Sequence, residues 1–137
     1  MIAKCVDGDS FSSAFVGACS RNHPDIFQAF LDQGMNADIM DHNGSTALIE
    51  ASTNVREESV QLLLNHNSRP NVQNRSGWTA LMWASCFGSK NIVQLLLNYG
   101  ADIDLKNKEG YTALDFARTQ EIKDMIQNHV NTSYVLK

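Results

Sequence analysis

The sequence predicts an all-α solenoid, in which stacked helix-turn-helix units are joined by β-hairpin loops. Two observations carry this prediction. The same residues return every 33 positions along the chain, and each returning block holds the start and end signals of two short helices. Five columns keep the period over three copies: Gly44, Gly77 and Gly110; Thr46, Thr79 and Thr112; Ala47, Ala80 and Ala113; Leu48, Leu81 and Leu114; Ala51, Ala84 and Ala117.

The first helix of each unit is predicted to begin at the threonine column, because a hydroxyl just after a turn glycine accepts hydrogen bonds from first-turn amides. The second helix carries the apolar run, as in "VQLLLNHN" from Val60 and "VQLLLNYG" from Val93. Gly34, Asn67 and Gly100 close these helices, since glycine and asparagine tolerate positive φ.

The pattern gives expected boundaries for every element. Helices are predicted near 12–20, 25–33, 46–54, 57–65, 79–87, 90–98, 112–118 and 120–129, with hairpins near 35–44, 68–77 and 101–110. A helix pair cannot bury both of its faces alone, so the units are predicted to stack.

Composition narrows the class of protein. The chain has 137 residues, a formal net charge of −4 and 43% apolar residues, which fits one soluble globular domain. An acidic chain does not favour binding to nucleic acid or to anionic membranes. The three cysteines are an odd number without regular spacing, as in reduced thiols. We find neither a signal peptide nor an apolar stretch of about 20 residues. A cytoplasmic or nuclear location is therefore expected.

No pattern of residues typical of an enzyme is present. The four histidines are scattered without metal-ligand spacing, and the common nucleophile, phosphate-loop and metalloprotease motifs are missing. The sequence therefore predicts a protein that is not an enzyme, with no catalytic residues, no metal and no cofactor.

The repeated segments resemble the ankyrin repeat. "DHNGSTALIEAS", "NRSGWTALMWAS" and "NKEGYTALDFAR" match the first half of that unit, and "NIVQLLLNYGADID" matches the second half. The resemblance covers residues 8 to 129 and implies one domain over 1–137. Its four repeats lie near 8–40, 41–73, 74–106 and 107–129, followed by a tail over 130–137 that is predicted to be frayed.

The terminal repeats depart from the pattern and are expected to act as caps. The first has Phe11 and Ser13 where glycine and threonine belong. The last is shortened by four residues, because Ala117 is followed by Ile122 five positions on, where Ala84 reaches Val93 in nine.

The resemblance implies an interaction protein that binds a protein or peptide on its concave face. The columns that usually face the groove or its rim give the candidate binding residues: His42, Asn43, Ser45, Thr53, Asn54, Arg75, Ser76, Trp78, Cys86, Phe87, Tyr99, Lys106, Lys108, Glu109 and Tyr111. Aromatic residues flanked by basic ones suit an acidic-aliphatic ligand. The chain is expected to be a monomer.

Four residues carry separate expectations. Trp78 is predicted to be exposed in the groove, whereas Trp83 shares a core column with Phe116 and is predicted to be buried. Glu50 occupies that same core column, so it must reach solvent or find a partner. The resemblance also makes Asn71 a candidate for hydroxylation, the alternative being an asparagine that hydrogen-bonds its own hairpin.

Three other functions fit the same fold. The chain is alternatively a targeting module of a larger enzyme, kinase or channel, an inhibitor that clamps a partner enzyme, or an architectural protein that forms homo-oligomers.

Overall fold

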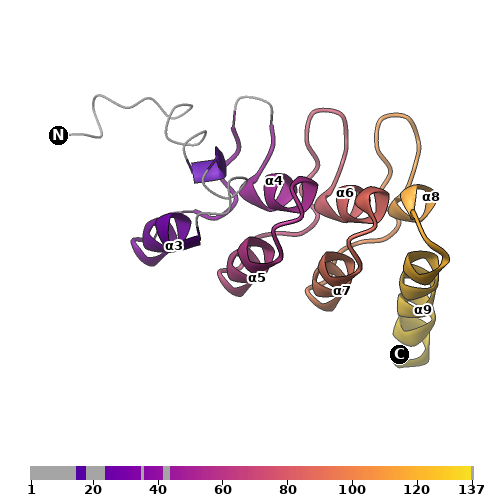
Figure 1. The fold of residues 1–137 in the computed structure, drawn as a ribbon. Helices are drawn as coiled ribbons and strands as arrows, with labels where there is room; N and C mark the ends of the chain where they lie inside the picture. Colours follow the sequence, from indigo (N-terminus) through magenta and orange to yellow (C-terminus); the bar gives the residue numbers. More distant parts are fainter. Residues whose placement is uncertain (1–14, 18–23, 35, 42–43, 137) are drawn as a thin grey trace.

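Two rows of helices build the structure (Figure 1). The computed structural model describes residues 15–17, 24–34, 36–41 and 44–136, and their side chains as far as residue 129 except those of Pro24 and Phe27. One row holds the first helices of the repeats: α4 (Ala47–Thr53), α6 (Ala80–Phe87) and α8 (Ala113–Phe116). The other holds the second helices: α3 (Pro24–Asp32), α5 (Glu57–Asn65), α7 (Lys90–Asn98) and α9 (Gln120–Leu136). The predicted all-α solenoid is confirmed.

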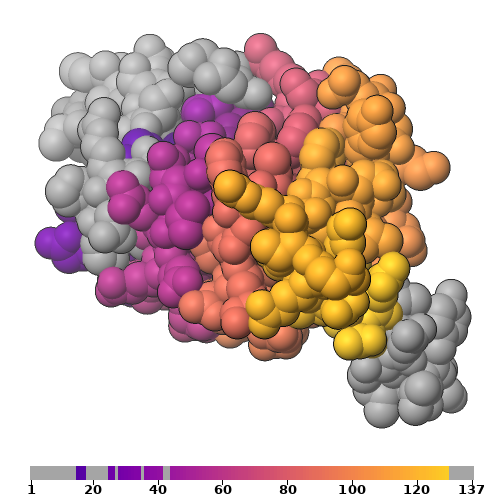
Figure 2. Space-filling view, turned by 45° about the vertical axis from the view of Figure 1, so that its right-hand side comes forward, coloured from indigo at the N-terminus to yellow at the C-terminus, as the bar shows by residue number. Residues whose placement is uncertain are grey.

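The repeats follow one another in sequence order along the stack. In the space-filling view they form successive coloured bands, with the yellow C-terminal band closing one end (Figure 2). Long loops project from the row of first helices, all on the same side (Figure 1). Across the part of the chain that the structure describes, no helix has both the length and the apolar character needed to cross a membrane.

Threonine caps start the first helices, as predicted. The hydroxyl oxygens of Thr46 and Thr79 accept hydrogen bonds from first-turn amides at 3.2 Å. Thr112 forms a reciprocal capping box with Asp115, which satisfies donors on both sides of the helix start. Each helix therefore begins one residue after its threonine.

Residues with positive φ end the helices. Gly88 closes α6 at φ +73°, and Asn67 follows α5 at φ +67°. Val55 holds the position of Gly88 one period earlier and has φ +58°. A β-branched residue is rare in this region because its side chain crowds the backbone.

The core lies between the two rows of helices. The repeated leucines Leu48, Leu63, Leu81 and Leu96 are each at most 1% exposed, and burying one such side chain stabilises the fold by about 1.5–3 kcal/mol. The alanine columns are also buried, with exposed fractions of at most 9%, and their small size lets neighbouring helices approach closely.

The loops keep a hairpin path but do not form strands. In the described residues, Met40 and Thr46 make an isolated antiparallel bridge, and no longer pairing occurs. Asn74 shows why: its backbone N–H donates to the Trp78 carbonyl, while its side-chain oxygen accepts from the amides of Ser76 and Trp78. Side-chain bonds thus replace part of the backbone ladder, and the predicted hairpin loops form without strands.

Neighbouring loops are tied to one another. Asn71 accepts a hydrogen bond from the Asp102 amide at 2.6 Å and donates to the Gly100 carbonyl at 3.2 Å. The Lys108 amide donates to the carbonyl of Ser76 at 3.0 Å. These contacts connect the last two loops to each other.

The first and last predicted helices can be compared with the helices of the structure. Of the helix expected over 12–20, residues 15–17 are described and are helical. The last helix runs to Leu136 instead of ending near 129 as the sequence predicted. No glycine or proline interrupts residues 120–136, and nothing local therefore stops the helix.

Candidate functional site

Five aromatic rings form a continuous row across the last two repeats. Neighbouring ring centroids lie 5.8 Å apart for Phe87 and Trp83, and 4.2 Å apart for Trp83 and Trp78. The row continues from Trp78 to Phe116 at 4.3 Å and from Phe116 to Tyr111 at 5.8 Å. We call these five residues the aromatic row. Three of the four contacts are stacked and the last is edge-on, geometries that stabilise aromatic pairs beyond area burial.

The helix caps explain how the row is built. Trp78 directly precedes the N-cap Thr79, and Trp83 is the fourth residue after that cap. Apolar residues at these two positions pack together across a helix start, an arrangement known as the hydrophobic staple. Tyr111 and Phe116 hold the same positions at the start of α8. The contact between Trp78 and Phe116 joins the two staples.

The predicted difference between the tryptophans is wrong. Trp78 and Trp83 are both partly buried, and each packs against the hydrophobic core. Phe116 is also partly buried, although its column was predicted to lie in the core. The hydrophobic staple packs the residue before each N-cap against the fourth residue after it. Both residues are therefore partly buried, although one was predicted to be exposed and the other buried.

The second repeat replaces this staple by a polar pair. Ser45 is only 5% exposed, and its hydroxyl donates to Glu50 at 2.9 Å. Glu50 is partly exposed, so it has both access to solvent and a hydrogen-bond partner, as the sequence required. Since the Ser45 hydroxyl is already engaged, Ser45 does not join the exposed candidate residues.

The aromatic row is accessible at both ends. Phe87 is 42% exposed and Tyr111 is 50% exposed. Arg75, Lys106 and Lys108 are exposed on the loops that precede α6 and α8. Ser76 and Glu109 are exposed on the same loops and occupy equivalent positions. The ring contacts join three of the predicted residues, Trp78, Phe87 and Tyr111.

The other predicted residues lie elsewhere or are engaged locally. Thr53 and Asn54 donate to carbonyls of their own helix, and Cys86 is a partly buried free thiol. Tyr99 caps α7 in the row of second helices and bonds to α5, so it lies apart from the aromatic row. His42 and Asn43 are outside the described residues.

Asn71 does not bond its own loop. It is exposed, and both of its side-chain hydrogen bonds reach the next loop. Within the described residues, no three histidine, cysteine or acidic side chains lie close enough to hold a metal ion.

The comparisons with known proteins agree with this architecture. The family model for ankyrin repeats in three copies matches residues 3–74 and 56–128. The solved ankyrin repeat domain of Bcl-3, described as a unique member of the IkappaB protein family, is similar at 35% identity with a TM-score of 0.79. The alignment covers 83% of this chain and 50% of that one. Among curated proteins, none matches significantly.

The chain belongs to the ankyrin repeat family. Proteins of this family are protein–protein interaction modules and are typically not enzymes.

Proposed function

We propose that the chain is a non-catalytic adaptor or scaffold that binds a protein or peptide segment on its concave face. The proposed face is made of the first helices and the loops, and the residues of the aromatic row belong to α6, α8 and the loops before them. The single observation that carries the proposal is the row itself, whose end rings Phe87 and Tyr111 are 42% and 50% exposed. Large aromatic side chains supply much of the energy at protein interfaces, so exposed ones favour a binding role.

Basic side chains on the last two loops support a ligand that is acidic and aliphatic. Arg75, Lys106 and Lys108 carry three positive charges on the loops that precede α6 and α8, and Glu109 carries one negative charge. Exposed charges of this kind speed association and select the partner more than they add affinity. Binding is therefore expected to slow as salt concentration rises, because salt screens exposed charges.

The remaining parts of the proposal follow from composition. With a net charge of −4, the chain is proposed to bind neither nucleic acid nor membranes. It is proposed to need no cofactor, to act as a monomer and to reside in the cytoplasm or the nucleus. The alternatives remain a targeting module of a larger enzyme, kinase or channel, and an inhibitor of a partner enzyme. The chain spans half of the Bcl-3 domain that it matches.

Affinity capture with matched variants tests the binding face. The wild-type chain, the double variant Phe87→Ser/Tyr111→Ser and the control Ile26→Ser would be immobilised and exposed to cell extract. Ile26 is a suitable control because it is 45% exposed on α3, in the row of second helices. Melting temperatures would first establish that all three are folded.

Proteins that are retained by the wild type and by Ile26→Ser, but lost from the double variant, are the expected partners. Their identity separates the alternatives, since an inhibitor retains an enzyme in inactive form. If the double variant retained the same proteins as the wild type, the concave face would not be the binding site. Light scattering of the free chain tests the proposed monomer.

Asn71 is proposed as a hydroxylation site. Its side chain is exposed on a loop, where a modifying enzyme has access. Mass spectrometry of protein isolated from eukaryotic cells would show a mass increase of about 16 on the peptide that contains it, the mass of one added oxygen atom. Unmodified peptide throughout would contradict the proposal.

A further inference from the structure

A pair of polar side chains returns in three consecutive second helices. Each pair is a glutamine followed four residues later by asparagine or aspartate, so both lie on one helix face. In each pair the glutamine amide donates to the second side chain. The pairs are Gln28 and Asp32 at 2.7 Å, Gln61 and Asn65 at 3.0 Å, and Gln94 and Asn98 at 2.9 Å.

The middle pair binds the hydroxyl of a tyrosine from the next repeat. The Tyr99 hydroxyl donates to Asn65 at 2.8 Å and accepts from Gln61 at 3.2 Å. A Gln–Asn pair therefore presents one acceptor and one donor, which together satisfy both hydrogen-bonding roles of a hydroxyl.

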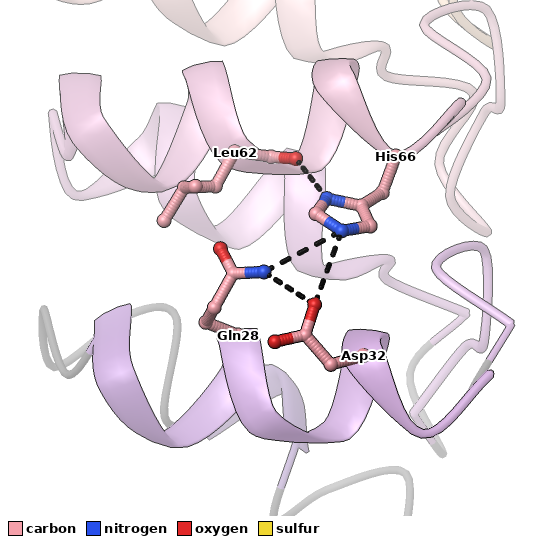
Figure 3. Close-up of polar contacts among 4 residues, drawn as sticks. All are labelled: Gln28, Asp32, Leu62 and His66. Carbon is pink, nitrogen blue, oxygen red and sulfur yellow. Dashed lines mark hydrogen bonds and ion pairs between the residues drawn. The ribbon is translucent and has the colours of Figure 1, made fainter.

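The first pair meets a histidine at the same place in its repeat (Figure 3). His66 donates from Nδ1 to the Leu62 carbonyl at 2.9 Å, which directs Nε2 towards α3. There Nε2 lies 3.5 Å from the Gln28 amide nitrogen and 3.7 Å from an Asp32 oxygen. At the first two interfaces between repeats, the pair and the ring are thus in direct contact.

His129 supplies the ring for the third pair. The helices α7 and α9 begin at Lys90 and Gln120, so equivalent residues of the two helices are 30 positions apart. The buried apolar residues of both helices keep the same spacing. His129 therefore occupies the column of Tyr99.

At the third interface the ring and the pair stand apart. His129, Gln94 and Asn98 line a pocket between α7 and α9 that has a volume of about 370 Å³. The other lining residues are Leu97, Met125 and Asn128. Within the part of the chain that the structure describes, no hydrogen bond joins His129 to either member of the pair. An open space thus separates groups whose counterparts touch at the first two interfaces.

The polar lining of this pocket can both donate and accept hydrogen bonds. Three of its four polar side chains are amides, each with an NH₂ donor and a carbonyl acceptor. The fourth is the imidazole of His129, which has one nitrogen of each kind when neutral. The described residues around the pocket include no carboxylate, lysine or arginine, so a charged ligand would lose hydration without meeting an opposite charge. The lining therefore favours an uncharged ligand whose polar groups also donate and accept.

We propose that this pocket binds a neutral molecule with several hydroxyl groups, of the class of polyols and sugar rings. One hydroxyl binds Gln94 and Asn98 as the Tyr99 hydroxyl binds the preceding pair, and a second reaches His129 across the pocket. Leu97 and Met125 supply apolar surface for the carbon skeleton.

The size and place of the pocket fit this proposal. Its volume falls within the range of roughly 300–1,000 Å³ found for small-ligand sites. It lies in the row of second helices, apart from the aromatic row, so the proposal does not depend on the function assigned to the concave face.

Two probes with the same carbon ring test the pocket. Myo-inositol has six hydroxyl groups and cyclohexanol has one. Each would be titrated into the isotope-labelled full chain while the side-chain amide signals of Gln94 and Asn98 are followed by NMR. We expect both signals to shift with myo-inositol, and its affinity to be about fivefold or more higher than that of cyclohexanol, the effect of one additional hydrogen bond.

Three variants provide the matched comparison, with melting temperatures establishing that each is folded. Asn98→Leu removes one member of the pair, and His129→Phe keeps a ring but removes both ring nitrogens. Each is expected to weaken the shift of the Gln94 signal by myo-inositol about fivefold or more. Gln127→Leu changes an exposed neighbour that does not line the pocket and should respond like the wild type.

Four results would overturn the proposal. A wild-type chain that shows no shift with myo-inositol would mean that the pocket holds water alone. Equal affinity for the two probes would mean that the pocket does not recognise hydroxyl groups. An unchanged response in both Asn98→Leu and His129→Phe would place the binding elsewhere. If the response were missing from the wild type and appeared only in His129→Ala, the histidine itself would be the occupant of the pocket.

Discussion

Trp78 and Trp83 stack with their ring centroids 4.2 Å apart and their planes inclined by 28°. The contact spans the N-cap of α6, since one ring precedes the cap and the other lies on the first turn. The next repeat has a tyrosine and a phenylalanine in these positions, and the preceding repeat has the Ser45–Glu50 hydrogen bond. One backbone geometry therefore carries three different side-chain contacts.

The stack predicts that the two tryptophans contribute jointly to stability. Trp78→Ala and Trp83→Ala are each expected to lower the free energy of unfolding by about 2–4 kcal/mol, less than for a fully buried ring because both are partly exposed. In the double variant the losses should not add, and a coupling of about 0.5–1.5 kcal/mol is expected for an aromatic pair. Urea unfolding of the four proteins measures this coupling.

The conservative variant Trp78→Phe serves as the control for this cycle. It keeps a ring in contact with both neighbours and should lose much less stability than Trp78→Ala. Strictly additive losses would mean that the two rings act independently, and the row would then be no more than a set of separate side chains.

Leu96→Ala tests the stacking of the repeats. Leu96 is fully buried, so its truncation is expected to cost about 2–5 kcal/mol. In a short stack each repeat depends on its neighbours, and we expect the melting transition of the whole chain to move as one. The exposed neighbour Gln94→Ala is the control. If Leu96→Ala melted like the wild type, the predicted register of the third repeat would be incorrect.

The sequence predicts most of the fold because the period repeats local signals. Threonine caps, terminal glycines and apolar runs each act within a few residues, and all three appear in the structure where the sequence places them. The loops were harder to predict, since the side chain of Asn74 bonds within its own loop whereas that of Asn71 bonds to the next loop. The length of α9 was missed because the repeat pattern ends before the helix does.

The candidate site was predicted only in part. The exposed aromatic and basic residues of the last two repeats were found from their columns. The role of Trp83 was missed, although its place four residues after the cap, with Trp78 just before it, is a recognisable signal in the sequence.

Asn71→Ala tests the connection between the last two loops. The change removes hydrogen bonds to Gly100 and Asp102, and a cost of about 1–2 kcal/mol is expected at this exposed site. Asn71→Asp keeps the acceptor for the Asp102 amide but loses the donor, so it should lie between alanine and the wild type. Asp38 already shows the acceptor half of this arrangement, accepting from the Arg69 amide at 2.8 Å.

Hydrogen exchange of the Asp102 amide gives a local reading of the same bond. Exchange should be fastest in Asn71→Ala and close to wild type in Asn71→Asp. Equal protection in all three proteins would show that the bond does not hold the loop.

Val55→Gly is expected to stabilise the protein. Val55 has φ +58° and occupies the column in which Gly88 has φ +73°. A left-handed conformation costs an ordinary residue about 1–2 kcal/mol, and a β-branched side chain pays at least as much. Glycine removes this cost but gives back about 0.5–1 kcal/mol of backbone entropy. Because Val55 is 47% exposed, little packing is lost, and a net gain of about 1 kcal/mol remains. Thermal unfolding should register it as a rise of a few degrees.

The reciprocal change Gly88→Val should destabilise the protein, since it imposes the same strain and brings its Cβ to 3.3 Å from Arg118 Cδ. A Val55→Gly protein no more stable than the wild type would mean that the valine side chain makes compensating contacts in the folded chain.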